Sequence, residues 1–124
     1  MKALVIDDSR TMRMLLKRIL SEVGITDVVE AEHGLDALDK LREHDSFDVA
    51  LVDWNMPEMC GYDFVRIVRT KREYDTMRLM MVTTESEMEQ MVKALEAGAD
   101  EYVMKPFTPD VIKDKLALIG VMAA

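Results

Sequence analysis

Four short apolar runs, each followed at once by polar or charged residues, constrain the fold of this chain more than any other feature. The runs span residues 3–6, 49–52, 79–82 and 102–104, and they lead into Asp7-Asp8, Asp53, Thr83 and Lys105. Short apolar runs separated by about one βα unit are typical of strands in a parallel sheet. Because the carboxyl ends of such strands line one crevice, these polar side chains are predicted to meet there.

The segments between the runs have the spacing of amphipathic helices. We expect strands at residues 2–6, 27–31, 48–52, 78–82 and 101–104. Apolar spacing predicts the buried faces of five helices: Met12, Leu15, Leu16, Ile19, Leu20 and Val23; Leu35, Leu38 and Leu41; Phe64, Val65 and Val68; Met88, Met91, Val92 and Leu95; Val111, Ile112, Leu116 and Ile119. Alternating strands and helices with short connections predict a parallel sheet with helices on both faces.

Local signals mark several helix ends. Ser9 is the expected N-cap of the first helix, and Gly24 is the expected residue just past its end. The fourth helix is expected to open with a capping box at residues 86–89. Thr108 and Pro109 predict the start of the fifth helix, a capping residue followed by proline at the first helical position.

Length and charge restrict the class of protein. A chain of 124 residues is enough for one domain, and we expect residues 1–124 to form it. The formal net charge of −8 would repel a duplex nucleic acid or an anionic membrane, so binding to either is not expected. No apolar stretch matches a membrane span or a signal-peptide core, and the single cysteine excludes an intrachain disulfide. A cytoplasmic location is therefore expected.

The polar residues at the strand ends predict a specific chemistry. Asp7, Asp8 and Asp53 make an oxygen-rich anionic pocket of the kind that Mg²⁺ prefers. Lys105 and Thr83 add an ammonium and a hydroxyl, and the combination suits a phosphoryl group, whose charge is spread over several oxygens. Asp53 stands alone at its strand end and is the candidate nucleophile of an aspartyl phosphate. Without metal, repulsion is expected to raise the pKa of at least one of the three carboxyls.

Four strings of sequence carry a resemblance to a known family. They are VIDDSRTMR, LVDWNMPEMCG, VTTE and YVMKPF. In this order they resemble the receiver domains of two-component response regulators, and the chain looks most like the small stand-alone chemotaxis regulators. The resemblance spans the whole chain. It implies a flavodoxin-like α/β fold, a single doubly wound, five-stranded parallel sheet with five helices, whose order 2-1-3-4-5 is known from the family itself and is taken over from it.

The resemblance gives the acidic residues defined roles. Asp53 matches the phosphoacceptor, which takes a phosphoryl group from a phosphohistidine of a sensor kinase. Asp8 and Asp53 match direct Mg²⁺ ligands, and the backbone carbonyl of Asn55 matches a third. Asp7 matches the acid that holds a metal-bound water. Mg²⁺ is the implied cofactor.

Other positions match groups that contact the phosphoryl group or respond to it. Thr83 matches the hydroxyl that moves onto the phosphoryl group, and Lys105 matches the ammonium that contacts it. Tyr102 matches an aromatic residue that switches between outward and inward packing. Asn55 and Glu85 match positions that tune the lifetime of the phosphoryl group. The resemblance implies a signalling protein that assists its own phosphotransfer and dephosphorylation, and not an enzyme in the ordinary sense.

Two details of the family pattern concern the backbone. The bond between Lys105 and Pro106 is often cis in this family. The residue before Gly61 is often Asp, whereas this chain has Cys60, which is expected to weaken the cap of the third helix by ~1 kcal/mol.

Three other classes of protein share part of the pattern. Haloacid-dehalogenase-like phosphatases also use an Asp nucleophile and Mg²⁺, but they place a second Asp where this chain has Asn55, and they carry cap insertions. A flavodoxin-like FMN carrier would need a first loop that attracts phosphate, which Asp7-Asp8 would repel. A receiver from a longer transcription factor would continue into a linker, which residues 120–124 do not resemble. A flagellar-motor regulator, a phosphorelay shuttle and a phosphate sink all remain open.

The expected partners are a histidine kinase as phosphodonor and a downstream protein target, with the flagellar motor switch as one candidate. The target surface is expected on the fourth helix, fifth strand and fifth helix, and the protein is expected to be a monomer. Candidate exposed residues on that surface are Lys93, Glu96, Glu101 and Lys113.

The first helix offers a possible second surface. It carries Arg10, Arg13, Lys17 and Arg18 in a chain that is otherwise acidic. Arg10, Met14 and Lys17 share one face, opposite most of the core stripe. A docking patch for the kinase and a solvated face with one stray methionine both fit this pattern.

Overall fold

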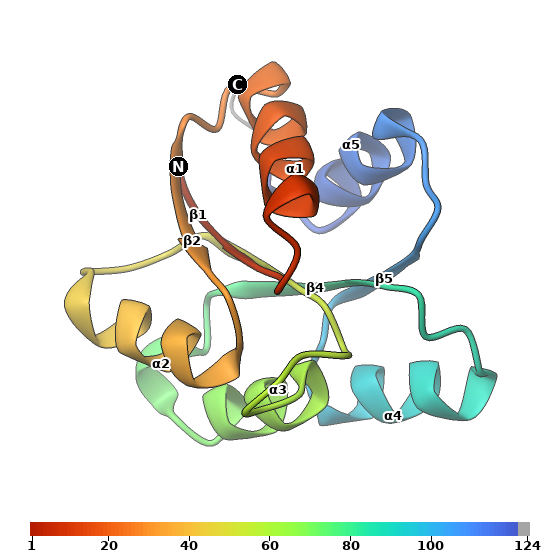
Figure 1. Cartoon of the computed structure of the whole chain (residues 1–124). Coiled ribbons are helices and arrows are strands. Elements are labelled where there is room, and N and C mark those ends of the chain that lie inside the picture. Colours follow the sequence, from red (N-terminus) through yellow and green to blue (C-terminus); the bar gives the residue numbers. More distant parts are fainter. Residues whose placement is uncertain (122–124) are drawn as a thin grey trace.

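The computed structural model describes residues 1–121, in which strands and helices alternate along the chain (Figure 1). The strands are β1 (Lys2–Ile6), β2 (Asp27–Ala31), β3 (Val49–Val52), β4 (Arg78–Thr83) and β5 (Glu101–Met104). The α-helices are α1 (Arg10–Glu22), α2 (Gly34–Glu43), α3 (Gly61–Arg69), α4 (Met88–Ala97) and α5 (Pro109–Leu118). The predicted strands agree with these bounds to within one residue. A short 3₁₀ helix, η1 (Arg72–Tyr74), was not expected.

All strand pairs are parallel, and the order across the sheet is β2-β1-β3-β4-β5. The register brings the carboxyl ends of the strands close to one level: Ile6 lies opposite Val52, and Thr83 lies opposite Met104. Residues that follow these strands therefore emerge at one edge of the sheet. The predicted fold class and strand order are confirmed.

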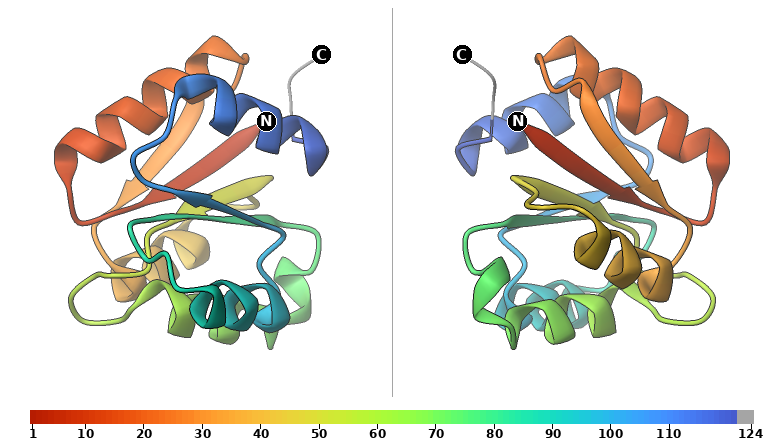
Figure 2. Two further views of the ribbon diagram at one scale, coloured as in Figure 1. Left: turned by 90° about the vertical axis from the view of Figure 1, so that its right-hand side faces the viewer. Right: turned by 90° about the vertical axis from the view of Figure 1, so that its left-hand side faces the viewer.

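Helices cover both faces of the sheet. Helices α1 and α5 lie on one face, and α2, α3 and α4 lie on the other (Figures 1 and 2). Successive residues of β1 point to opposite faces, so Leu4 and Ile6 belong to the core beneath α2, α3 and α4, whereas Ala3 and Val5 belong to the core beneath α1 and α5. Within residues 1–121, no helix has the length and apolar composition needed to cross a membrane.

Most helix ends agree with the sequence signals. The Ser9 hydroxyl accepts a hydrogen bond from the Met12 N–H at 3.2 Å, and Gly24 has a positive φ of 89° just past α1. Cys60 occupies the N-cap position of α3 without a side-chain hydrogen bond, as its replacement of Asp predicts. The bond between Lys105 and Pro106 is cis.

Two cap predictions were wrong in detail. The predicted capping box does not form, because α4 begins at Met88 and Glu87 holds the N-cap position without a side-chain hydrogen bond. Thr108 does precede Pro109 at the start of α5, but its hydroxyl makes no capping bond.

The predicted buried face of α4 was wrong for three of its four residues, since only Met91 packs against the core. Met88, Val92 and Leu95 are 74%, 45% and 41% exposed. The buried residue of this helix is Ala94, which lies on the opposite side from Val92. A small side chain lets α4 sit close to the sheet, and the larger apolar residues are left outside. Smaller errors of the same kind affect Leu15, Leu35 and Val111, which are exposed at the margins of their predicted stripes.

Candidate functional site

The residues at the strand ends are fixed by backbone hydrogen bonds that continue the sheet. The N–H of Asp7 donates to the Ala31 carbonyl at 3.1 Å, and the N–H of Asp53 donates to the Ile6 carbonyl at 3.0 Å. The N–H of Lys105 donates to the Thr83 carbonyl at 2.8 Å. The predicted site residues therefore stand on the rigid edge of the sheet, and not on free loops.

The three predicted carboxylates come together. Asp7, Asp8 and Asp53 each offer an oxygen, and these oxygens lie within 4.8 Å of one another. Asp7 and Asp53 are buried, while Asp8 is exposed. Like charges held this close, two of them buried, are costly unless a cation lies among them. Oxygen ligands of this number and kind suit a hard divalent cation such as Mg²⁺.

The carboxylate of Asp7 is already held by the protein. One oxygen accepts a hydrogen bond from the Ser9 N–H at 2.8 Å, and the other accepts one from the Lys105 ammonium at 2.7 Å. The side chain of Asp7 is thus oriented on both sides. Asp8, exposed beside it, is the freer of the two for a direct ligand.

Asp53 is the least satisfied buried group of the cluster. Its Oδ1 is buried and has no hydrogen-bond partner among the described residues. Its Oδ2 lies 3.7 Å from the Lys105 ammonium. Burial raises the pKa of Asp53, and the negative charge of Asp7 adds to the rise, while Lys105, the Thr83 hydroxyl and the backbone N–H of Trp54 oppose it. The predicted rise is confirmed, but its main cause is burial rather than repulsion.

Thr83 and Tyr102 are joined through the backbone of Glu85. The Thr83 hydroxyl accepts a hydrogen bond from the Glu85 N–H at 3.2 Å, and the Tyr102 hydroxyl donates to the Glu85 carbonyl at 2.7 Å. The side chain of Tyr102 is buried. Burial raises the pKa of Tyr102 to about 12, helped by the charges of Glu85 and Asp53, so the hydroxyl keeps its proton and remains a donor.

Comparison with known proteins identifies the family. The sequence profile of the response regulator receiver domain matches residues 3–117. This chain belongs to the response regulator receiver family. It is 48% identical over 116 residues to a chemotaxis protein CheY homolog of Campylobacter jejuni (strain 81-176), across 94% of this chain and 89% of that protein. It is 46% identical over 119 residues to the chemotaxis protein CheY1 of Helicobacter pylori (strain ATCC 700392 / 26695), across 96% of each chain.

Solved structures agree with this assignment. The fold is similar to that of the chemotaxis response regulator CheY4 of Vibrio cholerae, with a TM-score of 0.86, 34% identity, and coverage of 95% of this receiver and 97% of that chain. The resemblance found in the sequence strings is confirmed, and so is the flavodoxin-like fold.

The structure of this receiver adds one residue that sequence reasoning misplaced. Arg13 was counted among the basic residues of the first helix, but its side chain is buried. Its guanidinium donates to the Asp7 carbonyl at 2.7 Å and to the Glu30 carboxylate at 3.0 Å. Arg13 thus fixes the backbone from which Asp7 projects. Its spacing of three and seven residues before Leu16 and Leu20 placed it on the core face and could have revealed this.

The turn after β3 requires a glycine. The N–H of Gly61 donates to the Trp54 carbonyl at 2.8 Å, and a Cβ on Gly61 would lie 2.0 Å from the carbonyl oxygen of Asp53. The indole of Trp54 stacks on the Tyr62 ring with centroids 5.2 Å apart and an interplanar angle of 5°. Asn55, between them in the turn, is exposed. Close packing therefore holds the turn that carries Asp53.

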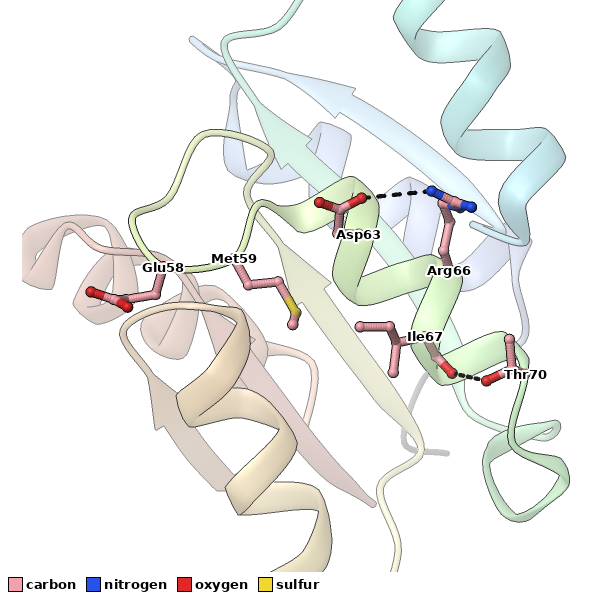
Figure 3. Close-up of a pocket in the computed structure, with 6 residues that line it drawn as sticks. All are labelled: Glu58, Met59, Asp63, Arg66, Ile67 and Thr70. Atoms are coloured by element: carbon pink, nitrogen blue, oxygen red, sulfur yellow. Dashed lines mark hydrogen bonds and ion pairs between the residues drawn. The ribbon is translucent and has the colours of Figure 1, made fainter.

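A hollow of about 450 Å³ lies along α3 (Figure 3). It is lined by Glu58, Met59, Asp63, Arg66, Ile67 and Thr70. In Figure 3, Arg66 pairs with Asp63, and the Thr70 hydroxyl donates to the Ile67 carbonyl. None of the three clustered carboxylates lines this hollow. It is separate from the candidate site.

Proposed function

We propose that this receiver, spanning residues 1–124, is a single-domain response regulator that accepts a phosphoryl group on Asp53 from a phosphohistidine of a sensor kinase. The observation that carries the proposal is the state of Asp53, a buried carboxylate. Its Oδ1 has no hydrogen-bond partner among the described residues, and its Oδ2 lies 3.7 Å from the Lys105 ammonium. The names of the similar Campylobacter and Helicobacter proteins support a role in chemotaxis. A cytoplasmic location and the flagellar motor switch as a candidate target are part of the proposal.

The acidic cluster is suited to Mg²⁺. Asp8 and Asp53 would hold the ion directly, together with the backbone carbonyl of Asn55, and Asp7 would hold it through water. The close oxygens and the unpartnered Oδ1 of Asp53 support this assignment. When bound, the ion would neutralise charge on the phosphoryl oxygens.

The residues of the chain itself would carry the transfer. A carboxylate oxygen of Asp53 attacks phosphorus, an O–P bond forms, and the bond from phosphorus to the histidine nitrogen breaks. The Lys105 ammonium would balance the added negative charge, and the Thr83 hydroxyl would donate a hydrogen bond to a phosphoryl oxygen. Asn55 and Glu85, each two residues past a site residue, would set how easily water reaches the phosphoryl group.

The link between Thr83 and Tyr102 supplies a route for the switch. Movement of the Thr83 hydroxyl onto a phosphoryl oxygen would break the hydrogen bond that this hydroxyl now accepts from the Glu85 N–H. A shift of this peptide would also alter the carbonyl that receives the Tyr102 hydroxyl. One local charge change would thus bias the packing of Tyr102 and the surface of α4, β5 and α5 around it. An unchanged Tyr102 ring signal in NMR spectra after addition of a phosphate mimic would exclude this route.

Phosphorylation by a small phosphodonor tests the proposed function directly. Wild-type protein with acetyl phosphate and Mg²⁺ is expected to gain the mass of one phosphoryl group, and peptide mapping is expected to place it on Asp53. The Asp53→Asn variant should gain none, whereas the control Asp63→Asn, at an exposed position of α3, should behave as wild type. An unmodified wild-type protein, or equal modification of Asp53→Asn, would overturn the proposal.

A further inference from the structure

A buried arginine lies beside the acidic cluster without forming an ion pair with it. The side chain of Arg13 on α1 is buried, and a buried charge is costly unless it is paired and hydrogen-bonded. The ion pair that it forms joins its Nε to the Glu30 carboxylate on β2 at 3.0 Å. Among residues 1–121, it has no ion pair with any of the three clustered carboxylates. Arg13 is therefore not the counter-ion of the acidic cluster.

The other contact of Arg13 is with the backbone between two residues of the acidic cluster. Its guanidinium donates to the Asp7 carbonyl at 2.7 Å, and this hydrogen bond is buried. The Asp7 carbonyl and the Asp8 N–H belong to one planar peptide unit. Arg13 therefore fixes the plane of the peptide that joins Asp7 to Asp8.

The side chains of the two adjacent acids are held differently. The Asp7 carboxylate accepts hydrogen bonds from the Ser9 N–H and from the Lys105 ammonium. The Asp8 carboxylate is exposed and has no ion pair within the described part of the chain. The position of the Asp8 carboxylate before a cation binds therefore depends on the backbone that Arg13 holds.

Glu30 holds the guanidinium from a rigid support. It lies on β2 opposite Val5 of β1, one residue before Ala31, whose carbonyl accepts the Asp7 N–H at 3.1 Å. The carboxylate that orients Arg13 and the peptide that Arg13 holds thus stand on neighbouring strands of one sheet. A planar guanidinium directs its N–H groups at fixed angles to two such acceptors, which a lysine ammonium does not.

We propose that Arg13 and Glu30 are positioning residues of the metal site. Arg13 would hold the peptide before Asp8, so that the Asp8 carboxylate is already in place for a cation, and Glu30 would hold the Arg13 guanidinium. The proposal rests on the proposed function, because it concerns how the Mg²⁺ site described there is assembled. Groups that orient metal ligands without touching the metal commonly contribute about 10–100-fold to metal affinity.

Charge and position predict opposite effects on Mg²⁺ affinity when Arg13 is replaced. A positive charge near the site repels a cation, so its removal in Arg13→Met would by itself strengthen Mg²⁺ binding. Loss of the restraint on the peptide is expected instead to weaken Mg²⁺ binding about tenfold. Arg13→Lys keeps the charge but loses the fixed pair of N–H donors, so it is expected to weaken binding about fivefold.

Titrations with Mg²⁺ followed by Trp54 fluorescence measure these affinities. Glu30→Met removes a partner of Arg13 at a partly exposed position and is expected to weaken binding about fivefold, whereas Glu30→Gln keeps the acceptor and should stay within about twofold of wild type. Arg18→Met removes an exposed charge from the same helix and should also stay within about twofold. Arg69→Ala removes an arginine that binds carbonyls at the other edge of the sheet, and it should keep the wild-type affinity.

Two further readouts separate positioning from a general loss of structure. In NMR relaxation measurements on the metal-free protein, the Asp8 amide is expected to gain fast motion in Arg13→Met and Glu30→Met, but not in Arg18→Met. Phosphorylation by acetyl phosphate is expected to need about tenfold more Mg²⁺ in Arg13→Met, yet to reach within about threefold of the wild-type rate at saturating Mg²⁺. All assays are run at a temperature at which each variant is folded.

Tighter Mg²⁺ binding by Arg13→Met would show that Arg13 acts only through its charge, and it would overturn the inference. Wild-type affinity in Arg13→Lys and Glu30→Met would overturn it too, as would an equal loss of affinity in Arg69→Ala. These two milder variants decide the question if Arg13→Met does not fold.

The wild-type protein separates the two proposals. If wild type binds Mg²⁺ and the variants bind it equally well, only the positioning role is rejected. If wild type binds Mg²⁺ more tightly than the variants but Asp53 is not phosphorylated, only the phosphoryl transfer is rejected. A wild-type protein that binds no Mg²⁺ would reject the metal site and its positioning residues together.

Discussion

Two charged clusters at opposite edges of the sheet are built in contrasting ways. At the amino edge, where β4 and β5 begin, the Arg69 guanidinium donates to the carbonyls of Gly98, Tyr74 and Met77 at 2.9, 2.9 and 2.8 Å. It also donates to the Asp100 carboxylate at 3.0 Å. Every nitrogen of this side chain has a partner within the protein. The cluster joins α3, η1 and the loops before β4 and β5.

The cluster at the carboxyl edge is left incomplete. Three carboxylates crowd together there, and the Oδ1 of buried Asp53 has no partner among residues 1–121. Burial raises the pKa of Asp53, which means that the folded protein disfavours its charge. Charged side chains that stabilise a fold have their hydrogen-bond partners within the fold. Charged side chains retained for function can lack a partner until a ligand binds. Removal of a charged side chain from these clusters should therefore destabilise the protein at the amino edge and stabilise it at the carboxyl edge.

The largest change in stability is expected at the Arg69 cluster of the amino edge. Arg69→Ala removes four hydrogen bonds and the ion-pair partner of Asp100, whose carboxylate keeps only the Leu79 N–H, so it is expected to lower the free energy of unfolding by about 2–4 kcal/mol. Urea denaturation measures this loss. Arg66→Ala, on the exposed side of the same helix, is the control and should cost no more than about 0.5 kcal/mol. Equal small losses for both variants would show that the Arg69 cluster does not stabilise the fold.

The next largest change in stability is expected at the turn that supports Asp53. Gly61→Ala forces a Cβ against the Asp53 carbonyl and is expected to cost about 1–3 kcal/mol and to weaken metal binding. Gly120→Ala is the control, since its φ of 78° imposes strain of about 1 kcal/mol but no atom lies within 4 Å of the new methyl group. Thermal melts and Mg²⁺ titrations of both variants separate strain from damage to the site. Normal metal binding by Gly61→Ala would contradict the close approach.

A smaller effect, of opposite sign, is expected for Asp53 itself. Because its folded pKa is raised above its ordinary value of 3.8, the cost of the charged carboxylate is absent at pH below that value and grows as pH rises through the folded pKa. Asp53→Asn removes that cost and should stabilise the metal-free protein at neutral pH by about 0.5–2 kcal/mol. The gain should shrink on acidification. Urea denaturation at several pH values checks this, and a gain independent of pH would show another cause.

The smallest effect on stability is expected outside both clusters. Met14 is 61% exposed on α1 beside exposed Arg10 and Lys17, so Met14→Glu should change stability by no more than about 0.5 kcal/mol. If this face docks the kinase, the variant should receive phosphoryl groups from its kinase more slowly and from acetyl phosphate at the wild-type rate. Equal loss with both donors would indicate damage to the site instead.

The sheet and the acidic cluster were predictable because one sequence pattern encodes both. Apolar runs define the strands, and the residues that end them must lie at the same edge once the strands are parallel. The grouping of Asp7, Asp8 and Asp53 follows from topology alone. The burial of Tyr102 and its hydrogen bond to the Glu85 carbonyl did not follow, since any residue at position 85 would offer that carbonyl.

Other features were not predictable, for physical reasons. Arg69 and Arg13 bind backbone carbonyls, which every residue carries, so no partner is visible in the sequence. The apolar spacing of α4 predicted a buried face, yet Met88, Val92 and Leu95 are exposed on this helix. Periodicity shows which residues share a face. It does not show whether the sheet or another protein covers that face.

Paired thermal melts test most directly whether Mg²⁺ completes the incomplete site at the carboxyl edge of the sheet. Wild type, Asp8→Ala and Arg69→Ala are melted with and without Mg²⁺ while Trp54, next to Asp53, reports binding by fluorescence. Mg²⁺ should stabilise wild type by RT ln(1 + [Mg²⁺]/Kd), about 1–3 kcal/mol well above Kd. Arg69→Ala, though less stable than wild type, should be stabilised by Mg²⁺ to the same extent. Asp8→Ala should not be stabilised by Mg²⁺, and without metal it should be at least as stable as wild type. A wild-type melt indifferent to millimolar Mg²⁺, with no Trp54 response, would contradict the account.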